Sequence, residues 1–117
     1  CHMAISTHWM VHYLNAGMYE SEAKRAEESF FMTQYAEDFG KRHAHALKIM
    51  KERIGLDYFC LDCAETQDGK LLVFEVDHAA VIHAMDPPDL FPYKQTEMKK
   101  AFAAFRRLLA LAKRGSH

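Results

Sequence analysis

The sequence predicts an α+β domain in which a small antiparallel sheet is packed by helices. A β-hairpin is indicated over residues 57–64 and 70–77, because alternating apolar residues flank Asp68-Gly69, a dipeptide typical of tight hairpin turns. Apolar residues at helical spacing predict three helices, over residues 21–33, 36–54 and 96–113.

The N-terminal half supplies one strand and two of these helices. Residues 8–15 (HWMVHYLN) are rich in β-forming side chains and predict a strand. Ser21 is expected to cap the helix over residues 21–33, whose buried stripe is then Ala23, Ala26 and Phe30. Gly55 is expected to end the helix over residues 36–54, whose inward positions are Phe39, His43, Leu47, Met50 and Ile54.

The C-terminal half holds the hairpin, a loop with three prolines over residues 79–95, and the last helix. The inward positions of that helix are expected to be Met98, Phe102, Phe105, Leu109 and Ala112. The predicted order is therefore β-α-α-β-β-α.

Length and composition limit the classes of function. The chain of 117 residues suits one domain, expected over residues 4–113. Residues 1–3 and 114–117 resemble cloning residues and the start of a tag, so no functional role is expected for them. A net charge of -1 gives no electrostatic reason to expect a nucleic acid or an anionic membrane as partner.

Cysteine usage and hydropathy point to the cytoplasm. Three cysteines are too few and too uneven in number for a disulfide framework. No apolar run approaches the roughly 18 residues that a membrane-spanning helix needs. We therefore expect a cytoplasmic protein.

Three acidic residues of the hairpin are the strongest functional candidates. A two-residue Asp68-Gly69 turn sets Asp62 directly opposite Glu75, with Asp77 two residues further along the same face. Opposed Cβ atoms lie about 4.5–5.5 Å apart, so the two carboxylates repel each other unless a cation or a shared proton offsets the charge. Three carboxylates on one face therefore predict a metal site, and oxygen-only ligation favours Mg²⁺ or Mn²⁺ with substrate phosphates.

The alternative is that these acids only make an exposed face soluble. The other residues expected on that face argue against it because they are mostly apolar, namely Tyr58, Cys60, Ala64, Leu71 and Val73.

Two histidines follow the metal strand and are the candidate catalytic residues. His78 and His83 flank the carboxylates, and either one is suited to proton transfer. If one of them is instead a ligand, the site favours Zn²⁺ or another transition metal. His43 is expected to be a satisfied core histidine and His45 to be solvated. His8 and His12 are expected to be strand residues too far apart for one metal.

Several other residues have a structural explanation. Cys60 and Cys63 form a CxxC motif, but within a strand their thiols point to opposite faces. Lys94 is expected to be solvated rather than to meet a phosphate. The remaining candidates are turn residues and the outer face of the last helix, namely Asp86, Asp89, Lys99, Lys100, Arg106 and Arg107.

The stretch IGLDYFCLDCAETQDGKLLVFEVDHA, residues 54–79, resembles the catalytic core of the ATP-grasp superfamily. With HWMVHYLN before it and HAMDPPDLFPYKQ after it, the chain is similar to ATP-grasp proteins associated with tetratricopeptide repeats. The resemblance implies that Asp62, Glu75 and Asp77 match the acid and the Glu-x-Asn motif that bind the metals bridging ATP phosphates. Asp77 departs from the usual Asn and makes the site more negative.

The resemblance covers only the C-terminal part of the family's catalytic unit. The family's earlier lysines, its Gly-rich loop and its adenine-binding hinge have no counterpart in this chain. We therefore expect metal-dependent phosphoester chemistry, most simply hydrolysis of a phosphate-containing small molecule. The alternative is a metal- and nucleotide-binding half of an ATP-dependent carboxylate-amine ligase, inactive alone. Because the missing half leaves a sheet edge uncovered, a homodimer is expected.

Overall fold

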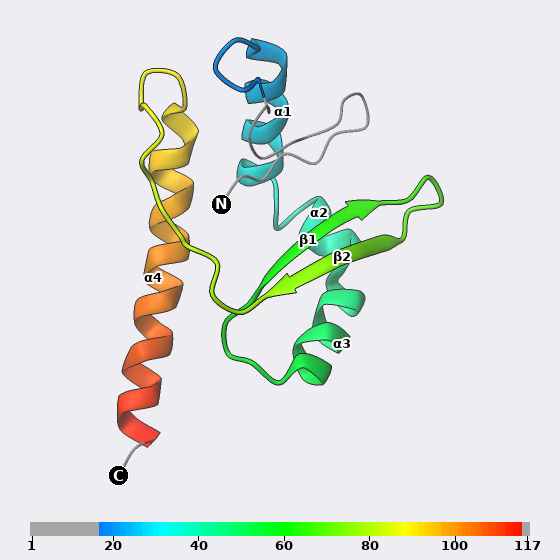
Figure 1. The fold of residues 1–117 in the computed structure, drawn as a ribbon, viewed down its shortest axis with the longest axis vertical. Coiled ribbons are helices and arrows are strands. Elements are labelled where there is room, and N and C mark those ends of the chain that lie inside the picture. Colours follow the sequence, from blue (N-terminus) through cyan, green and yellow to red (C-terminus); the bar gives the residue numbers. More distant parts are fainter. Residues whose placement is uncertain (1–16, 116–117) are drawn as a thin grey trace. The chain divides into compact units, whose positions relative to one another are not determined.

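The computed structural model describes residues 17–115, and these divide into two compact units at Ala80 and Val81. The first unit holds three helices and the hairpin, and the second holds a loop and one long helix (Figure 1). The α+β class with a two-stranded antiparallel sheet packed against helices is confirmed. The strand predicted over residues 8–15 lies outside the described residues.

Helix α1, Glu22–Thr33, begins where the sequence predicts because the Ser21 hydroxyl accepts a hydrogen bond from the Lys24 N–H at 3.3 Å. Its predicted buried stripe is wrong: Ala23, Ala26 and Phe30 are exposed. Glu28 is buried instead, and Phe31 packs edge-on against Tyr35 and Phe39, with ring centroids at 5.7 and 5.2 Å. The face of α1 that turns inward is therefore the one on which Phe31 contacts the two aromatic rings that follow the helix.

The helix predicted over residues 36–54 is two helices, α2 (Phe39–Arg42) and α3 (Ala44–Ile54). The break falls at His43, whose backbone angles (φ −107°, ψ 13°) are not helical. Its predicted inward position is confirmed, because His43 is only 4% exposed. Gly55 ends α3 in the left-handed region at φ 67°, as predicted.

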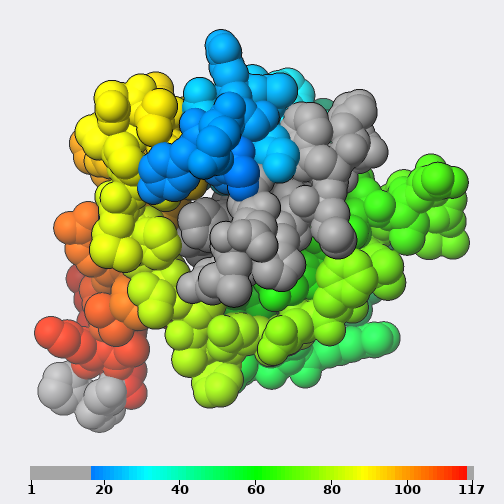
Figure 2. Space-filling model, turned by 45° about the horizontal axis from the view of Figure 1, so that its top comes forward, coloured from blue at the N-terminus to red at the C-terminus, as the bar shows by residue number. Residues whose placement is uncertain are grey.

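Strands β1 (Cys60–Glu65) and β2 (Leu71–Asp77) form the hairpin, but its predicted two-residue turn is wrong. Thr66 donates its N–H to the Lys70 carbonyl and accepts from the Gly69 N–H, both at 2.9 Å, which makes a three-residue loop. Gly69 supplies the positive φ (79°) that this loop requires. The turn projects from its unit (Figure 2).

The longer loop would put the strands one residue out of the predicted register, and a β-bulge restores it. Near the turn Cys63 pairs with Val73, but the next pair is Asp62 with Glu75, so Phe74 has no partner. The bulge therefore returns the acids to the predicted pairing. It also moves Leu71 and Val73, which pair with Glu65 and Cys63, away from the acidic face, and that part of the prediction is wrong.

In the second unit, helix α4 runs from Pro92 to Gly115 and begins four residues before its predicted start. Proline is well suited to the first helical position because it has no N–H to leave unpaired. Met98 is buried as predicted, but Phe105, Leu109 and Ala112 are exposed, so the predicted inward stripe holds only near the start of the helix. None of the helices in residues 17–115 is long and apolar enough to cross a membrane.

Candidate metal site on the hairpin

The carboxylates of Asp62 and Glu75 stand on paired positions of neighbouring strands, as the sequence predicts. Asp77 pairs with Cys60 two residues further along, on the same face. All three acids are exposed. They lie on one face of the hairpin. Glu65 lies on the opposite face, which is turned toward α2 and α3.

Asp77 is held by the chain that leaves the strand. Its Oδ1 accepts the Ala79 N–H at 2.8 Å, which fixes the turn after β2. Next to it, the Tyr58 hydroxyl donates to the Ala80 carbonyl at 2.5 Å. Burial, followed by the hydrogen bond to the Cys60 thiol, raises the pKa of Tyr58 to about 12. Tyr58 therefore stays a neutral donor, and its hydrogen bond connects the segment before β1 to the segment after β2.

The donor set fits a hard cation in type but not in number. Within residues 17–115, no three His, Cys, Asp or Glu side chains are grouped closely enough to hold one metal ion. The opposed pair of Asp62 and Glu75 offers carboxylate oxygens from two strands, and Asp77 has one oxygen already engaged. A cation on this pair would take its remaining ligands from water or phosphate oxygens, as Mg²⁺ commonly does.

The two candidate catalytic histidines differ in surroundings. His78 is exposed and directly follows Asp77 at the end of β2. His83 is half-buried in the second unit, where its Nδ1 accepts the Met85 N–H at 3.5 Å. The acids and His78 thus belong to one unit, and His83 belongs to the other.

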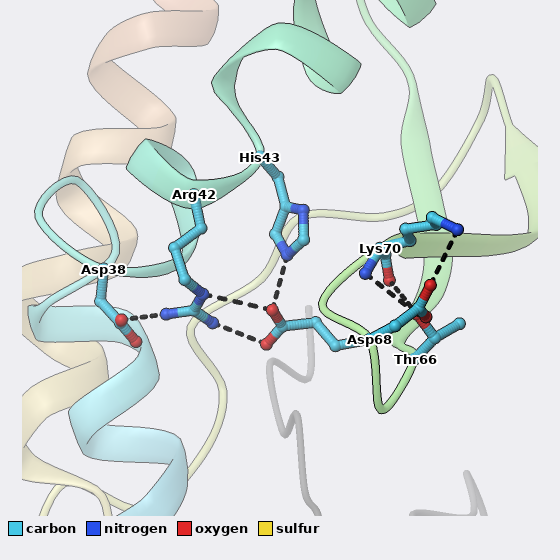
Figure 3. A network of polar contacts seen from close by, with 7 residues as sticks. Asp38, Arg42, His43, Thr66, Asp68 and Lys70 are labelled. Atoms are coloured by element: carbon cyan, nitrogen blue, oxygen red, sulfur yellow. Dashed lines mark hydrogen bonds and ion pairs between the residues drawn. The ribbon is translucent and has the colours of Figure 1, made fainter.

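A polar network that the sequence analysis missed joins α2 and α3 to β1 through Glu65 (Figure 3). Arg42 reaches Glu65 with Nη2 at 2.6 Å and Nε at 3.2 Å, and it also pairs with Asp38. His43 Nε2 lies 2.7 Å from the second Glu65 oxygen. The prediction that His43 is a satisfied core histidine is confirmed, but its partner comes from 22 residues away and leaves no local signal.

Glu65 is stabilised as an anion by this network. Burial alone would raise its pKa, but the hydrogen bonds from Arg42 and His43 outweigh that effect and hold the pKa of Glu65 below its usual range. The network therefore favours the charged carboxylate at neutral pH and fastens the helices to the sheet.

Lys94 is buried, so its predicted solvated position is wrong. Its Nζ lies 2.9 Å from Asp86 Oδ2 and 4.6 Å from the centre of the Phe91 ring. The early start of α4 explains this, because Lys94 then falls in the first turn beside Phe91. Asp86, predicted as a turn residue, is the ionic partner that a buried ammonium needs.

Cys60 and Cys63 are free thiols, and their pairing partners place them on opposite faces of the hairpin, as predicted. Burial, together with the negative charges of Asp62 and Glu65, raises the pKa of the Cys63 thiol. A thiol kept protonated in this way is a poor nucleophile. His45 is exposed, also as predicted.

No protein-family model matches the chain, and comparison with curated proteins and with solved structures finds no match either.

Proposed function

We propose that the acidic face of the hairpin binds a divalent cation, Mg²⁺ or Mn²⁺, and uses it in phosphoester chemistry, most simply hydrolysis of a phosphate-containing small molecule. The observation that carries the proposal is the register that pairs Asp62 with Glu75. The bulge at Phe74 maintains this pairing although the turn is longer than predicted.

The charges of the pair support a cation there. Like charges on directly opposed strand positions destabilise a hairpin. In the described part of the chain, neither Asp62 nor Glu75 forms an ion pair with a basic side chain. Both are exposed, so a cation and a phosphate can approach them from solvent.

The acids of the hairpin and the histidine that follows them then have distinct tasks. Asp62 and Glu75 hold the cation, and Asp77 offers the cation the carboxylate oxygen that does not accept the Ala79 N–H. When bound, such a cation polarises a phosphoryl oxygen and lowers the pKa of a bound water. His78, which directly follows β2 and is exposed, transfers a proton to the leaving oxygen.

The resemblance of residues 54–79 to the ATP-grasp core supports the same three acids as metal ligands. Free thiols at Cys60 and Cys63 fit the cytoplasm, where the proposed reaction takes place. If His78 is a ligand rather than a proton carrier, Zn²⁺ or another transition metal replaces Mg²⁺.

Hydrolysis of an activated phosphoester such as bis(p-nitrophenyl) phosphate tests the proposal. Chelation should abolish the activity, and Mg²⁺ or Mn²⁺ should restore it. Glu75→Gln should lower the rate on the order of a hundredfold or more, because it removes a ligand worth several kcal/mol of transition-state stabilisation. His78→Ala should cost roughly tenfold to a thousandfold if the ring carries a proton.

Glu52→Gln is the matched control, since Glu52 is an exposed acid on α3 and its loss should leave the rate unchanged. Activity that survives both the chelator and Glu75→Gln would place the chemistry elsewhere. Metal binding without turnover would favour the alternative, a metal- and nucleotide-binding half of a ligase that takes ATP.

A further inference from the structure

Charge is distributed very unevenly along this chain. Seven of the 15 Lys and Arg residues but only one of the 16 Asp and Glu residues lie in α4. Helix α4 therefore carries a net charge of +6 and the rest of the chain −7, which the overall value of -1 conceals. The net charge of -1 on the whole chain therefore does not exclude an anionic partner for this helix.

Five basic residues of α4 recur at a spacing of seven residues, about 10.5 Å along the helix. They are Lys99, Lys100, Arg106, Arg107 and Lys113, and all five side chains are exposed. Among the described residues, Lys100 alone of the five forms an ion pair, with Glu97 at 2.7 Å. Four charges on one half of the helix are therefore available to an external anion.

The other half of α4 is apolar. At about 100° per residue, the apolar residues cover roughly half of the helix circumference, and the exposed basic residues lie on the other half. Near the start of the helix this half is covered, since Met98 is buried, but Leu109 is 50% and Leu111 is 65% exposed.

We propose that residues 105–113 of α4 bind the surface of an anionic lipid bilayer with the helix axis in the plane of the surface. Phe105 and Leu109, one turn apart on the apolar half, enter the boundary between headgroups and acyl chains, and the exposed basic residues contact lipid phosphates. The helix is not apolar enough to cross the bilayer. The exposed positive charges favour an anionic lipid surface as the partner of this half-apolar helix.

Co-sedimentation of the full chain with vesicles tests this proposal. Binding is expected to vesicles of phosphatidylcholine with 30% phosphatidylglycerol, to weaken with added salt, and to be far weaker with pure phosphatidylcholine. Arg106→Gln with Arg107→Gln removes two charges near the surface and should weaken binding about 30-fold. Leu109→Gln should also weaken it.

Lys48→Gln with Lys51→Gln is the matched control. These two lysines are exposed on α3 and carry the same charge, so their loss should leave vesicle binding unchanged. Circular dichroism and a melting curve establish that each variant is folded. Equal binding to neutral vesicles, equal loss in the control, or no binding by the folded chain would overturn the proposal, as would a shift from dimer to monomer in Leu109→Gln.

Discussion

At the scale of single residues, Glu65 connects the helices of the first unit to the hairpin. It receives hydrogen bonds from Arg42, the last residue of α2, and from the buried His43, the residue that separates α2 from α3. Because both donors come from the helical segment and the acceptor from β1, the carboxylate fixes how that segment packs on the hairpin.

Glu65→Gln should lower the free energy of unfolding by about 1–2 kcal/mol at pH 7, because charge-assisted hydrogen bonds weaken when the acceptor becomes neutral. The expected loss is modest since the Arg42 side chain is 43% exposed and water screens its charge. Urea unfolding measures the change, and Glu52→Gln should leave stability within experimental error.

The difference in the free energy of unfolding between the wild type and Glu65→Gln should depend on pH. The pKa of Glu65 is lowered in the folded state, so its stabilisation is complete above the unfolded value of about 4.3 and is lost as the pH falls through the folded value. The difference between the wild type and Glu65→Gln should therefore narrow below pH 4. A constant difference down to pH 3 would mean that the charge of Glu65 is not the cause.

At the scale of elements, the sequence predicts the helix ends and the turn that depend on neighbouring residues in the chain. The start of α1 at Ser21 and the end of α3 at Gly55 follow from capping residues, and Asp68-Gly69 locates the hairpin. The break at His43 and the bulge at Phe74 depend on partners far along the chain, so no local pattern indicates them. The pairing of Asp62 with Glu75 was predicted although the turn was not, because the bulge offsets the longer loop.

Asp62→Asn should be neutral or stabilising in metal-free buffer, because it removes the repulsion across the pair with Glu75. With the wild type, added Mg²⁺ or Mn²⁺ should raise the melting temperature through binding to the folded state, and this increase should be smaller in Asp62→Asn. Clear destabilisation of the metal-free protein by Asp62→Asn would show that something other than a metal satisfies the two acids.

At the scale of the whole molecule, the hairpin leaves much apolar surface uncovered. Strand β2 exposes three large apolar side chains, with Phe74 at 69%, beside Leu72 and Val76. A hairpin of two strands is only marginally stable by itself, and exposed apolar strands tend to pair with strands of other chains. Both points favour association of this chain with a second copy.

Light scattering at micromolar concentration should give twice the mass of the chain, as expected for a symmetric homodimer. Phe74→Ser should shift the protein toward monomer, because it removes the most exposed aromatic ring of the hairpin. Leu111→Ser on α4 is the control and should remain dimeric. A monomeric wild type at this concentration would contradict the prediction.

The bulge also determines how the hairpin can change in length. Phe74 is the one residue of β2 without a partner in β1, so its deletion would turn the ladder into a regular one while Asp62 still faced Glu75. Deletion of a paired residue such as Val76 would instead move the side chains that follow it to the opposite face of the hairpin. Deletion of Phe74 is therefore the change in the length of β2 that leaves Asp62 paired with Glu75.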